Sequence, residues 1–202
     1  TTTSGLTSTM LYDGVERRTG EIDPRTGATT IHYGLGHLVD WVENAAGDRT
    51  DYEHDNTSKR LVSVTDPEGN QTKMAYDTHG RVIAQWGATY PVYYEFDDFG
   101  RMEKLHTLRD PAIQIGSLAD IMSVLASFDT TQWVYDNATG LLTRKLYADG
   151  KGPSYTYYPD GKLYTRTWAR QVGGNDLVTT YDYNSRNLLT DIDYSDGTPS
   201  VD

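Results

Sequence analysis

Cysteine is absent from the 202-residue chain, which excludes disulfide bonds, thiolate chemistry and zinc sites built on cysteine. Basic residues are also scarce: 18 Lys and Arg stand against 29 Asp and Glu, which gives a formal net charge of −11. Because nucleic-acid binding depends on basic patches that neutralise phosphates, we expect no nucleic-acid partner. No apolar run approaches the roughly 18 residues of a membrane-spanning helix, so we also expect no membrane insertion.

The sequence motifs of catalysis and cofactor binding are missing as well. The chain contains no H-E-x-x-H, no G-x-S-x-G elbow, no G-x-G-x-x-G and no P-loop. We therefore predict that the protein is not an enzyme and carries no cofactor, although a Ser-His-Asp triad needs no contiguous motif and stays an alternative. Carboxylates such as Asp97 and Asp98 leave Ca²⁺ binding as a second alternative; the simpler role of turn Asp residues is to bond their own backbone.

Aromatic and turn-forming residues are abundant by comparison. The chain has 16 Tyr, 4 Trp and 19 Gly, but only 3 Phe. Disordered chains are poor in aromatic residues, so this composition indicates an ordered protein. Tyr, Thr and Val between clusters of Gly, Asp and Asn are typical of short strands joined by tight turns.

A turn motif recurs at intervals of about 20 residues. Its fullest copy is 76–82, Y-D-T-H-G-R-V, where Asp favours the first turn position and Gly supplies the positive φ that returns the chain. The aromatic or His residues before the successive turns are Tyr12, Tyr33, His54, Tyr76, Phe96, Tyr135, Tyr158 and Tyr183. One interval has double length; the others predict an internal repeat, and such repeats form stacked or spiralling arrays.

Within each copy we assign particular residues to the turn. The structural turn residues are Tyr76, Asp77, Gly80 and Arg81; Phe96, Asp97, Gly100 and Arg101; Tyr135, Asp136 and Gly140; and Tyr158 and Gly161. Asn187 takes the glycine position in a further copy, and the His54 copy has no Gly, so we expect a looser turn there. A second set of turns, such as 66–70, D-P-E-G-N, alternates with the first, so each unit is a hairpin.

The double-length interval contains a helical pattern. Ser117 and Asp120 form a capping-box spacing, and the apolar residues Leu118, Ile121, Met122 and Leu125 follow a helical period. We predict one short α-helix near 117–127, inserted at about 110–130. It could act as a plug or docking element, or simply cover an apolar patch of the sheet.

The repeats resemble those of the Rhs, or YD-repeat, family, whose motif is Y-D-x-x-G-R-(L/V). Residues 76–82 match in full, 96–101 match apart from the first aromatic, and degenerate copies extend from about Tyr12 to Tyr194. The resemblance implies a mainly β fold in which consecutive antiparallel β-hairpins form one long curled sheet, a spiral shell or barrel segment. In this family such shells enclose toxin domains of bacterial secreted complexes or form ectodomains of animal adhesion receptors. The self-cleaving segment of bacterial members is not found here.

On this basis we predict one YD-repeat β array over 1–202, as a non-enzymatic structural segment that scaffolds or encloses part of a bacterial extracellular or cell-surface protein. The chain starts without Met and stops soon after a turn, so we expect its main partner to be the remainder of a longer parent polypeptide. Two alternatives stay open. One is an adhesin or carbohydrate-binding module with glycan contacts from Tyr93, Tyr155, Tyr157 and Trp168. The other is self-association through edge strands into a β-repeat fibre.

Overall fold

The computed structural model describes residues 5–201, which are mainly β. The ends of the predicted 1–202 array, residues 1–4 and 202, lie outside the described residues. The described strands are β1 (Thr9–Tyr12), β2 (Arg18–Asp23), β3 (Gly27–Tyr33), β4 (Val39–Glu43), β5 (Arg49–His54), β6 (Leu61–Thr65), β7 (Gln71–Tyr76), β8 (Val82–Gly87), β9 (Val92–Phe96), β10 (Met102–Thr107), β11 (Asp129–Tyr135), β12 (Leu142–Leu146), β13 (Ser154–Tyr157), β14 (Leu163–Val172), β15 (Asn175–Tyr183) and β16 (Leu189–Tyr194). Their spatial order follows the sequence, which confirms the predicted architecture of consecutive antiparallel hairpins.

The chain divides into two compact units. Unit 1 runs to Pro91 and includes Pro111–Ser123, whereas unit 2 consists of Val92–Asp110 and the chain from Val124 onward. The inserted helix therefore belongs to the unit of β1–β8 and not to that of the strands next to it in sequence. The prediction of a single array stays a prediction.

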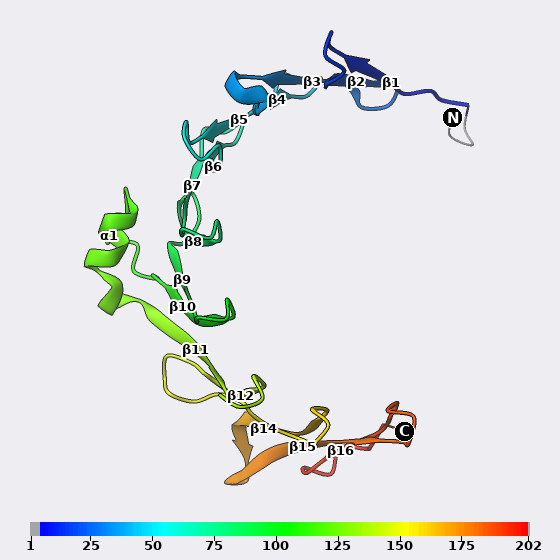
Figure 1. Ribbon diagram of the computed structural model, residues 1–202, viewed down its shortest axis with the longest axis vertical. Coiled ribbons are helices and arrows are strands. Elements are labelled where there is room, and N and C mark those ends of the chain that lie inside the picture. Colours follow the sequence, from blue (N-terminus) through cyan, green and yellow to red (C-terminus); the bar gives the residue numbers. More distant parts are fainter. Residues whose placement is uncertain (1–4, 202) are drawn as a thin grey trace. The chain divides into compact units, whose positions relative to one another are not determined.

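In unit 1, strands β1 to β8 pair in succession, each antiparallel to the next. Figure 1 shows them following one another along a curved, open path. The register shifts by one residue at the aromatic end of β1, β3, β5 and β7, directly before each repeat turn. Such bulges increase local twist, which accounts for the curvature within the unit.

In unit 2, strands β9 to β16 pair in the same way. The longest, β14, has ten residues and carries a larger irregularity between Thr167 and Gln171. At the outer edge of β16, Ile192 and Val201 exchange backbone hydrogen bonds of 2.9 and 3.1 Å. The tail of the described chain therefore partly covers this edge.

The predicted helix is present but shorter than 117–127. Helix α1 spans Leu118–Ser123, Val124 leaves the helical conformation, and a 3-10 turn follows at Leu125–Ser127; another 3-10 turn lies at Leu35–His37. The capping box forms as expected: Ser117 Oγ accepts from the Asp120 N–H at 3.2 Å, and Asp120 Oδ2 accepts from the Ser117 N–H at 2.9 Å. Ile121 is fully buried, whereas Met122 is exposed.

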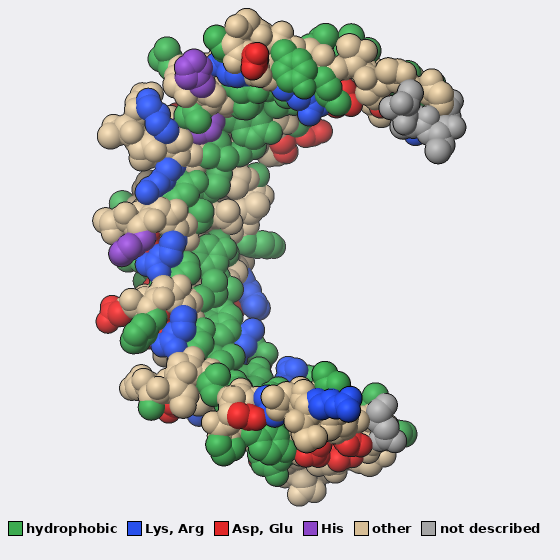
Figure 2. Space-filling view, turned by 45° about the vertical axis from the view of Figure 1, so that its right-hand side comes forward, with side chains coloured by type: hydrophobic (Ala, Val, Ile, Leu, Met, Phe, Trp, Pro, Cys, Tyr) green, Lys and Arg blue, Asp and Glu red, His purple; other side chains and the backbone are tan. Residues whose placement is uncertain are grey.

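Few described side chains are fully buried. The buried apolar residues are Ala84, Trp86, Leu108, Ile121, Phe128 and Leu177. Most strand residues are half-buried instead, because the strands form a single layer without a second sheet over it. Figure 2 shows hydrophobic side chains over the strands of the face in view, with Lys and Arg side chains recurring beside them. Contacts between neighbouring repeats must therefore supply much of the stabilisation that a core supplies elsewhere.

Candidate functional site

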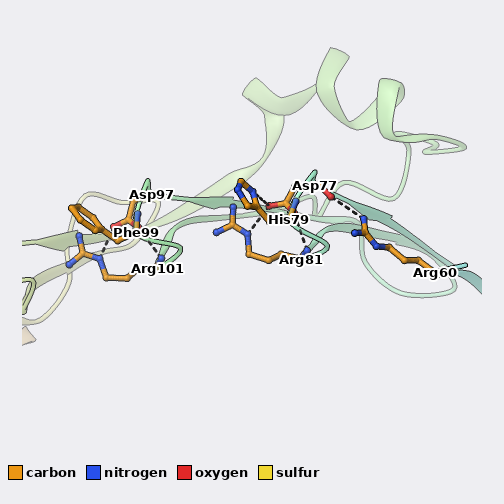
Figure 3. Close-up of polar contacts among 7 residues, drawn as sticks. All are labelled: Arg60, Asp77, His79, Arg81, Asp97, Phe99 and Arg101. Carbon is orange, nitrogen blue, oxygen red and sulfur yellow. Dashed lines mark hydrogen bonds and ion pairs between the residues drawn. The ribbon is translucent and has the colours of Figure 1, made fainter. Parts of the chain in front are cut away.

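The repeat turns are the most regular polar feature of the chain, and each starts directly after the last residue of a strand. In the turn at 77–81, Asp77 Oδ1 accepts from the backbone N–H groups of His79 and Arg81, both at 2.9 Å, and Oδ2 accepts from Arg81 Nε at 2.6 Å. Two backbone bonds, Asp77 N–H to Arg81 O and Gly80 N–H to Asp77 O, close the loop. The carboxylate thus holds both the turn and the arginine side chain (Figure 3).

The same arrangement recurs at Asp97 and Arg101, where the carboxylate accepts from Arg101 Nε at 2.7 Å. It also occurs at Asp13 and Arg17, with the corresponding bond at 2.7 Å. From the sequence we name only Tyr12 for this last copy and assign none of its turn residues. The Asp and Arg four residues apart after Tyr12 were the signal that could have identified it.

Hydrogen bonding lowers the pKa of these carboxyl groups. At Asp13 the backbone N–H of Arg17 is the main cause, supported by the Arg17 side chain. At Asp77 and Asp97, partial burial acts to raise the pKa. The hydrogen bonds from the backbone and side chain of the following arginine, together with its charge, outweigh burial and hold the pKa below the usual range. The ionised carboxylate is therefore the form that the turn stabilises.

The glycine position of each turn has positive φ. Gly80, Gly100, Gly140 and Gly161 have φ of +86°, +81°, +74° and +86°. Other residues take this conformation where Gly is missing: Glu16 at +65°, Lys59 at +60° and Asn187 at +63°. The turn after His54 is a six-residue version that keeps the closing backbone bonds, as is the turn after Tyr135. The absence of Gly therefore does not loosen the turn after His54.

One assigned aromatic shifts by one place. Tyr157 pairs with Leu163 in the way that Tyr76 pairs with Val82, and Tyr158 occupies the position of Asp77 at the start of its turn. Tyr158 Oη donates to Asp182 at 2.9 Å, and burial together with this carboxylate raises the pKa of Tyr158 to about 12. Two adjacent tyrosines made the sequence register ambiguous at this copy.

The repeat tyrosines bond backward to the preceding repeat. Their hydroxyl groups donate to the backbone carbonyl of the residue that follows the preceding turn. These bonds are Tyr33 to Arg18 at 2.8 Å, Tyr76 to Leu61 at 2.6 Å, Tyr135 to Met102 at 3.0 Å and Tyr157 to Leu142 at 2.6 Å. Each bond satisfies a carbonyl at the start of a strand and fixes the ring between two repeats.

The last residue of several turns reaches forward to the next repeat, in what we call the forward links. Its cationic group lies over the next aromatic ring and bonds to the next turn. The ring distances are 4.6 Å for Arg17 and Tyr33, 5.6 Å for Arg60 and Tyr76, 4.2 Å for Arg101 and Tyr135, and 5.1 Å for Lys162 and Tyr183. Each cation also has a polar partner in the next turn. Arg17 lies 2.7 Å from His37 Nδ1, Arg60 donates to Asp77 O at 3.1 Å, Arg101 donates to Gly140 O at 2.9 Å, and Lys162 donates to Asn187 Oδ1 at 2.6 Å.

The four predicted glycan contacts are half-buried and engaged in the sheet. Trp168 donates from Nε1 to Thr179 Oγ1 at 2.9 Å, and the Arg166 guanidinium covers its ring at 3.6 Å. Tyr157 makes the backward bond described above, Tyr93 packs against His106 at 5.8 Å, and Tyr155 lies opposite Arg166. More exposed aromatic residues lie elsewhere, among them Tyr90 and Phe99. Carbohydrate binding by the four predicted residues stays a prediction.

A second polar cluster joins β9, β10 and β11. The side chain of His106 is buried; its Nε2 lies 2.7 Å from Glu95 Oε1 and its Nδ1 lies 2.9 Å from Thr130 Oγ1. Lys104 completes the cluster with a 2.8 Å ion pair to Glu95. Partial burial acts to raise the pKa of Glu95, but the bonds from Lys104 and His106 lower it overall. Both ring nitrogens of His106 have partners on neighbouring strands, so the cluster fixes their register.

The described part of the chain contains no group of three or more His, Asp or Glu side chains placed to hold a metal ion. The turn Asp residues instead bond their own backbone, although the Ca²⁺ alternative has not been tested. No described helix has the length and apolar character needed to span a membrane.

The fold and the repeat turns define an array of antiparallel hairpins with Tyr-Asp turns. The family model Teneurin YD-shell matches residues 35–172, and the chain belongs to this family. This confirms the resemblance to YD-repeat proteins. No curated protein matches the chain.

Solved structures share the fold. The crystal structure of TcdB2-TccC3-Cdc42 contains a chain with a TM-score of 0.62 and 14% identity, covering 95% of this chain and 11% of that one. The crystal structure of TcdB2-TccC3-TEV gives a TM-score of 0.61 and 17% identity, covering 96% of this chain and 12% of that one. At these identities the likeness concerns the fold alone. The present chain spans about a tenth of the length of these structures.

Proposed function

We propose that the chain is a structural segment of a YD-repeat shell that scaffolds or encloses part of a larger extracellular or cell-surface bacterial protein. The observation that carries the proposal is the set of forward links. In each link the last residue of one turn contacts the ring and the turn of the next repeat. The charged side chains of the turns therefore hold neighbouring repeats together. The family and the small share of the structural relatives that the chain covers support a segment role.

The forward link of Arg101 offers a direct test. Arg101→Gln removes the cation over Tyr135 and the bond to Gly140 O, together with the bond to Asp97 within the turn, and we expect the free energy of unfolding to fall by about 1–2 kcal/mol. Arg186→Gln, at an exposed turn position, is the matched control and should change it by less than about 0.5 kcal/mol. Urea unfolding followed by far-UV circular dichroism measures both.

A double-mutant cycle with Tyr135→Leu isolates the contact between the two repeats. We expect the two substitutions to be non-additive, because each removes the same contact. Hydrogen exchange should also show faster exchange in β11 and β12 for Arg101→Gln. Additive effects, or a chain whose spectrum is dominated by helix or coil, would contradict a shell built on linked repeats.

Self-association is a second candidate, supported by β1. Its four residues are all exposed, and its outer edge has no partner among the described strands. Unpaired edges template pairing with another strand. Size-exclusion chromatography over a range of concentrations tests this candidate: a second copy on β1 predicts larger species that Met10→Lys reduces, and a monomer at every concentration argues against it.

A further inference from the structure

A hollow on one face of unit 2 gathers polar side chains from β12 to β15. In the strand register Arg144 lies opposite Ser154, and Ser154 lies opposite Thr167. Residues directly opposite across antiparallel strands project from the same face, so these three side chains form one row. The row lines the hollow together with Lys151, Gln171 and Asp176, among others.

Two irregularities of the backbone shape this hollow. In β14, residues 168–170 stand opposite Leu177 alone, because Thr167 pairs with Val178 and Gln171 pairs with Asp176. In the loop from β12 to β13, a side chain at Gly152 would clash with the backbone oxygen of Lys145, so the loop can pass this close only with glycine. Bulges and glycines at such close approaches are frequent beside binding sites, where they redirect side chains.

The charges of the hollow are unevenly matched. Arg144 and Lys151 line it, are exposed, and form no ion pair with any carboxylate of residues 5–201. Arg170 lines it too, but its charge already acts on Asp196 and helps to lower the pKa of that carboxyl group. Asp176 is the one carboxylate among the described lining residues, and its Oδ1 accepts a hydrogen bond from Gln171 Nε2 at 2.8 Å.

We propose that this hollow binds an anionic saccharide, a sugar ring that carries a phosphate, sulfate or carboxylate group. Arg144 and Lys151 pair with the oxyanion, because guanidinium and ammonium groups form the strongest hydrogen bonds with such groups. Ser154, Thr167 and Gln171 supply donors for ring oxygens and hydroxyls. Asp176 would repel an inorganic anion but accepts hydrogen bonds from sugar hydroxyls, so it favours a saccharide over the anion alone.

Recognition by polar side chains in this hollow differs from the stacking of a sugar ring on rows of aromatic side chains. The ring of Trp168 is already held by Arg166 and Thr179, so the polar row carries recognition. It is also independent of the shell proposal, since forward links hold the repeats together whether or not the hollow is occupied.

Isothermal titration calorimetry of the full chain with glucose 6-phosphate, glucose and inorganic phosphate at constant ionic strength tests the proposal. We expect saturable binding of glucose 6-phosphate, about tenfold tighter than of either fragment, because only the sugar phosphate engages both the cations and the side chains that bind hydroxyl groups. No saturable binding would overturn the proposal. Equal affinity for inorganic phosphate would overturn it too, since it would show a simple anion site.

Variants separate the two halves of the site. Arg144→Gln should weaken glucose 6-phosphate binding about tenfold, whereas Arg186→Gln, an exposed arginine outside the hollow, should leave it unchanged. Asp176→Asn should weaken the sugar phosphate but not inorganic phosphate. Equal losses in Arg144→Gln and Arg186→Gln, or unchanged sugar-phosphate binding in Asp176→Asn, would contradict the assignment. Unchanged far-UV spectra and melting temperatures verify that each variant folds.

Discussion

The hydroxyl of Tyr76 donates a 2.6 Å hydrogen bond to the backbone carbonyl of Leu61, the first residue of β6. The guanidinium of Arg60, the neighbour of Leu61, lies over the same ring. Tyr76 therefore contacts the preceding repeat in two ways, through its hydroxyl group and through the face of its ring. This explains why the motif favours Tyr over Phe at this position.

Removal of that hydroxyl should weaken the link while preserving the ring. We expect Tyr76→Phe to lower the free energy of unfolding by about 0.5–1.5 kcal/mol, because a part-buried carbonyl loses its donor. Tyr12→Phe is the matched control: Tyr12 is exposed, and the same deletion should cost less than about 0.5 kcal/mol. Urea unfolding measures both, and equal effects would show that the Leu61 bond contributes nothing.

Glycine at the turn corner should matter for two separable reasons. Gly80 and Gly161 share a φ of +86°, but a Cβ at Gly80 would lie 2.8 Å from Arg60 Nη2, whereas one at Gly161 meets nothing. We expect Gly161→Ala to cost about 1–2 kcal/mol from left-handed backbone strain alone. Gly80→Ala should cost more, because Arg60 must also move.

Thermal and urea unfolding of the two glycine variants give the comparison. His79→Ala, one residue before Gly80, serves as a surface control, since its side chain is 77% exposed and should matter by less than about 0.5 kcal/mol. Identical costs at Gly80 and Gly161 would show that the contact with Arg60 is unimportant.

One substitution should stabilise the chain. Glu16 occupies the glycine position of its turn at φ +65°, a conformation that strains residues with a Cβ. We expect Glu16→Gly to raise the free energy of unfolding by up to about 1 kcal/mol. Glu68→Gly, in an exposed turn where φ is not positive, should lower it instead because it only adds freedom to the unfolded chain. A loss of stability in Glu16→Gly would contradict the strain argument.

Acid should weaken the repeat turns. The pKa of Asp97 in the folded chain is below its unfolded value of about 3.9, so the unfolded state binds more protons in acid and stability rises with pH. The contribution of Asp97 is present above that unfolded value and is lost as the pH falls through the folded pKa. Asp97→Asn should therefore lower the free energy of unfolding at pH 7 and make it change less between pH 5 and pH 3. Urea unfolding at each pH measures both effects. An unchanged pH slope would show that Asp97 does not contribute.

Much of the hairpin array could be predicted from the sequence, because its turns are local. Asp, Gly and Arg at fixed spacing, as in 77–81, set turn geometry through bonds within five residues, and the capping box at Ser117 is equally local. The end of the helix was less predictable: Leu125 continues the apolar period, but Val124 leaves the helical conformation.

The contacts between repeats were not predicted, because they join residues far apart in sequence. Arg101 and Tyr135 are separated by the inserted segment, and only the fold shows that a cation at the end of one turn meets the ring before the next. The turn assignment of Tyr158 shifted for a related reason. Tyr157 and Tyr158 are chemically alike, and strand register alone distinguishes them.

The forward links all run in one direction along the chain, from the end of a turn to the next aromatic ring. The four joints that carry a forward link therefore present the same chemistry: a cation on the earlier side and a ring on the later side. Unequal recombination that duplicates a repeat with both a ring and a cation at the end of its turn would recreate such a joint without any new contact having to evolve. The number of repeats can therefore change while the contacts that join neighbouring repeats are kept.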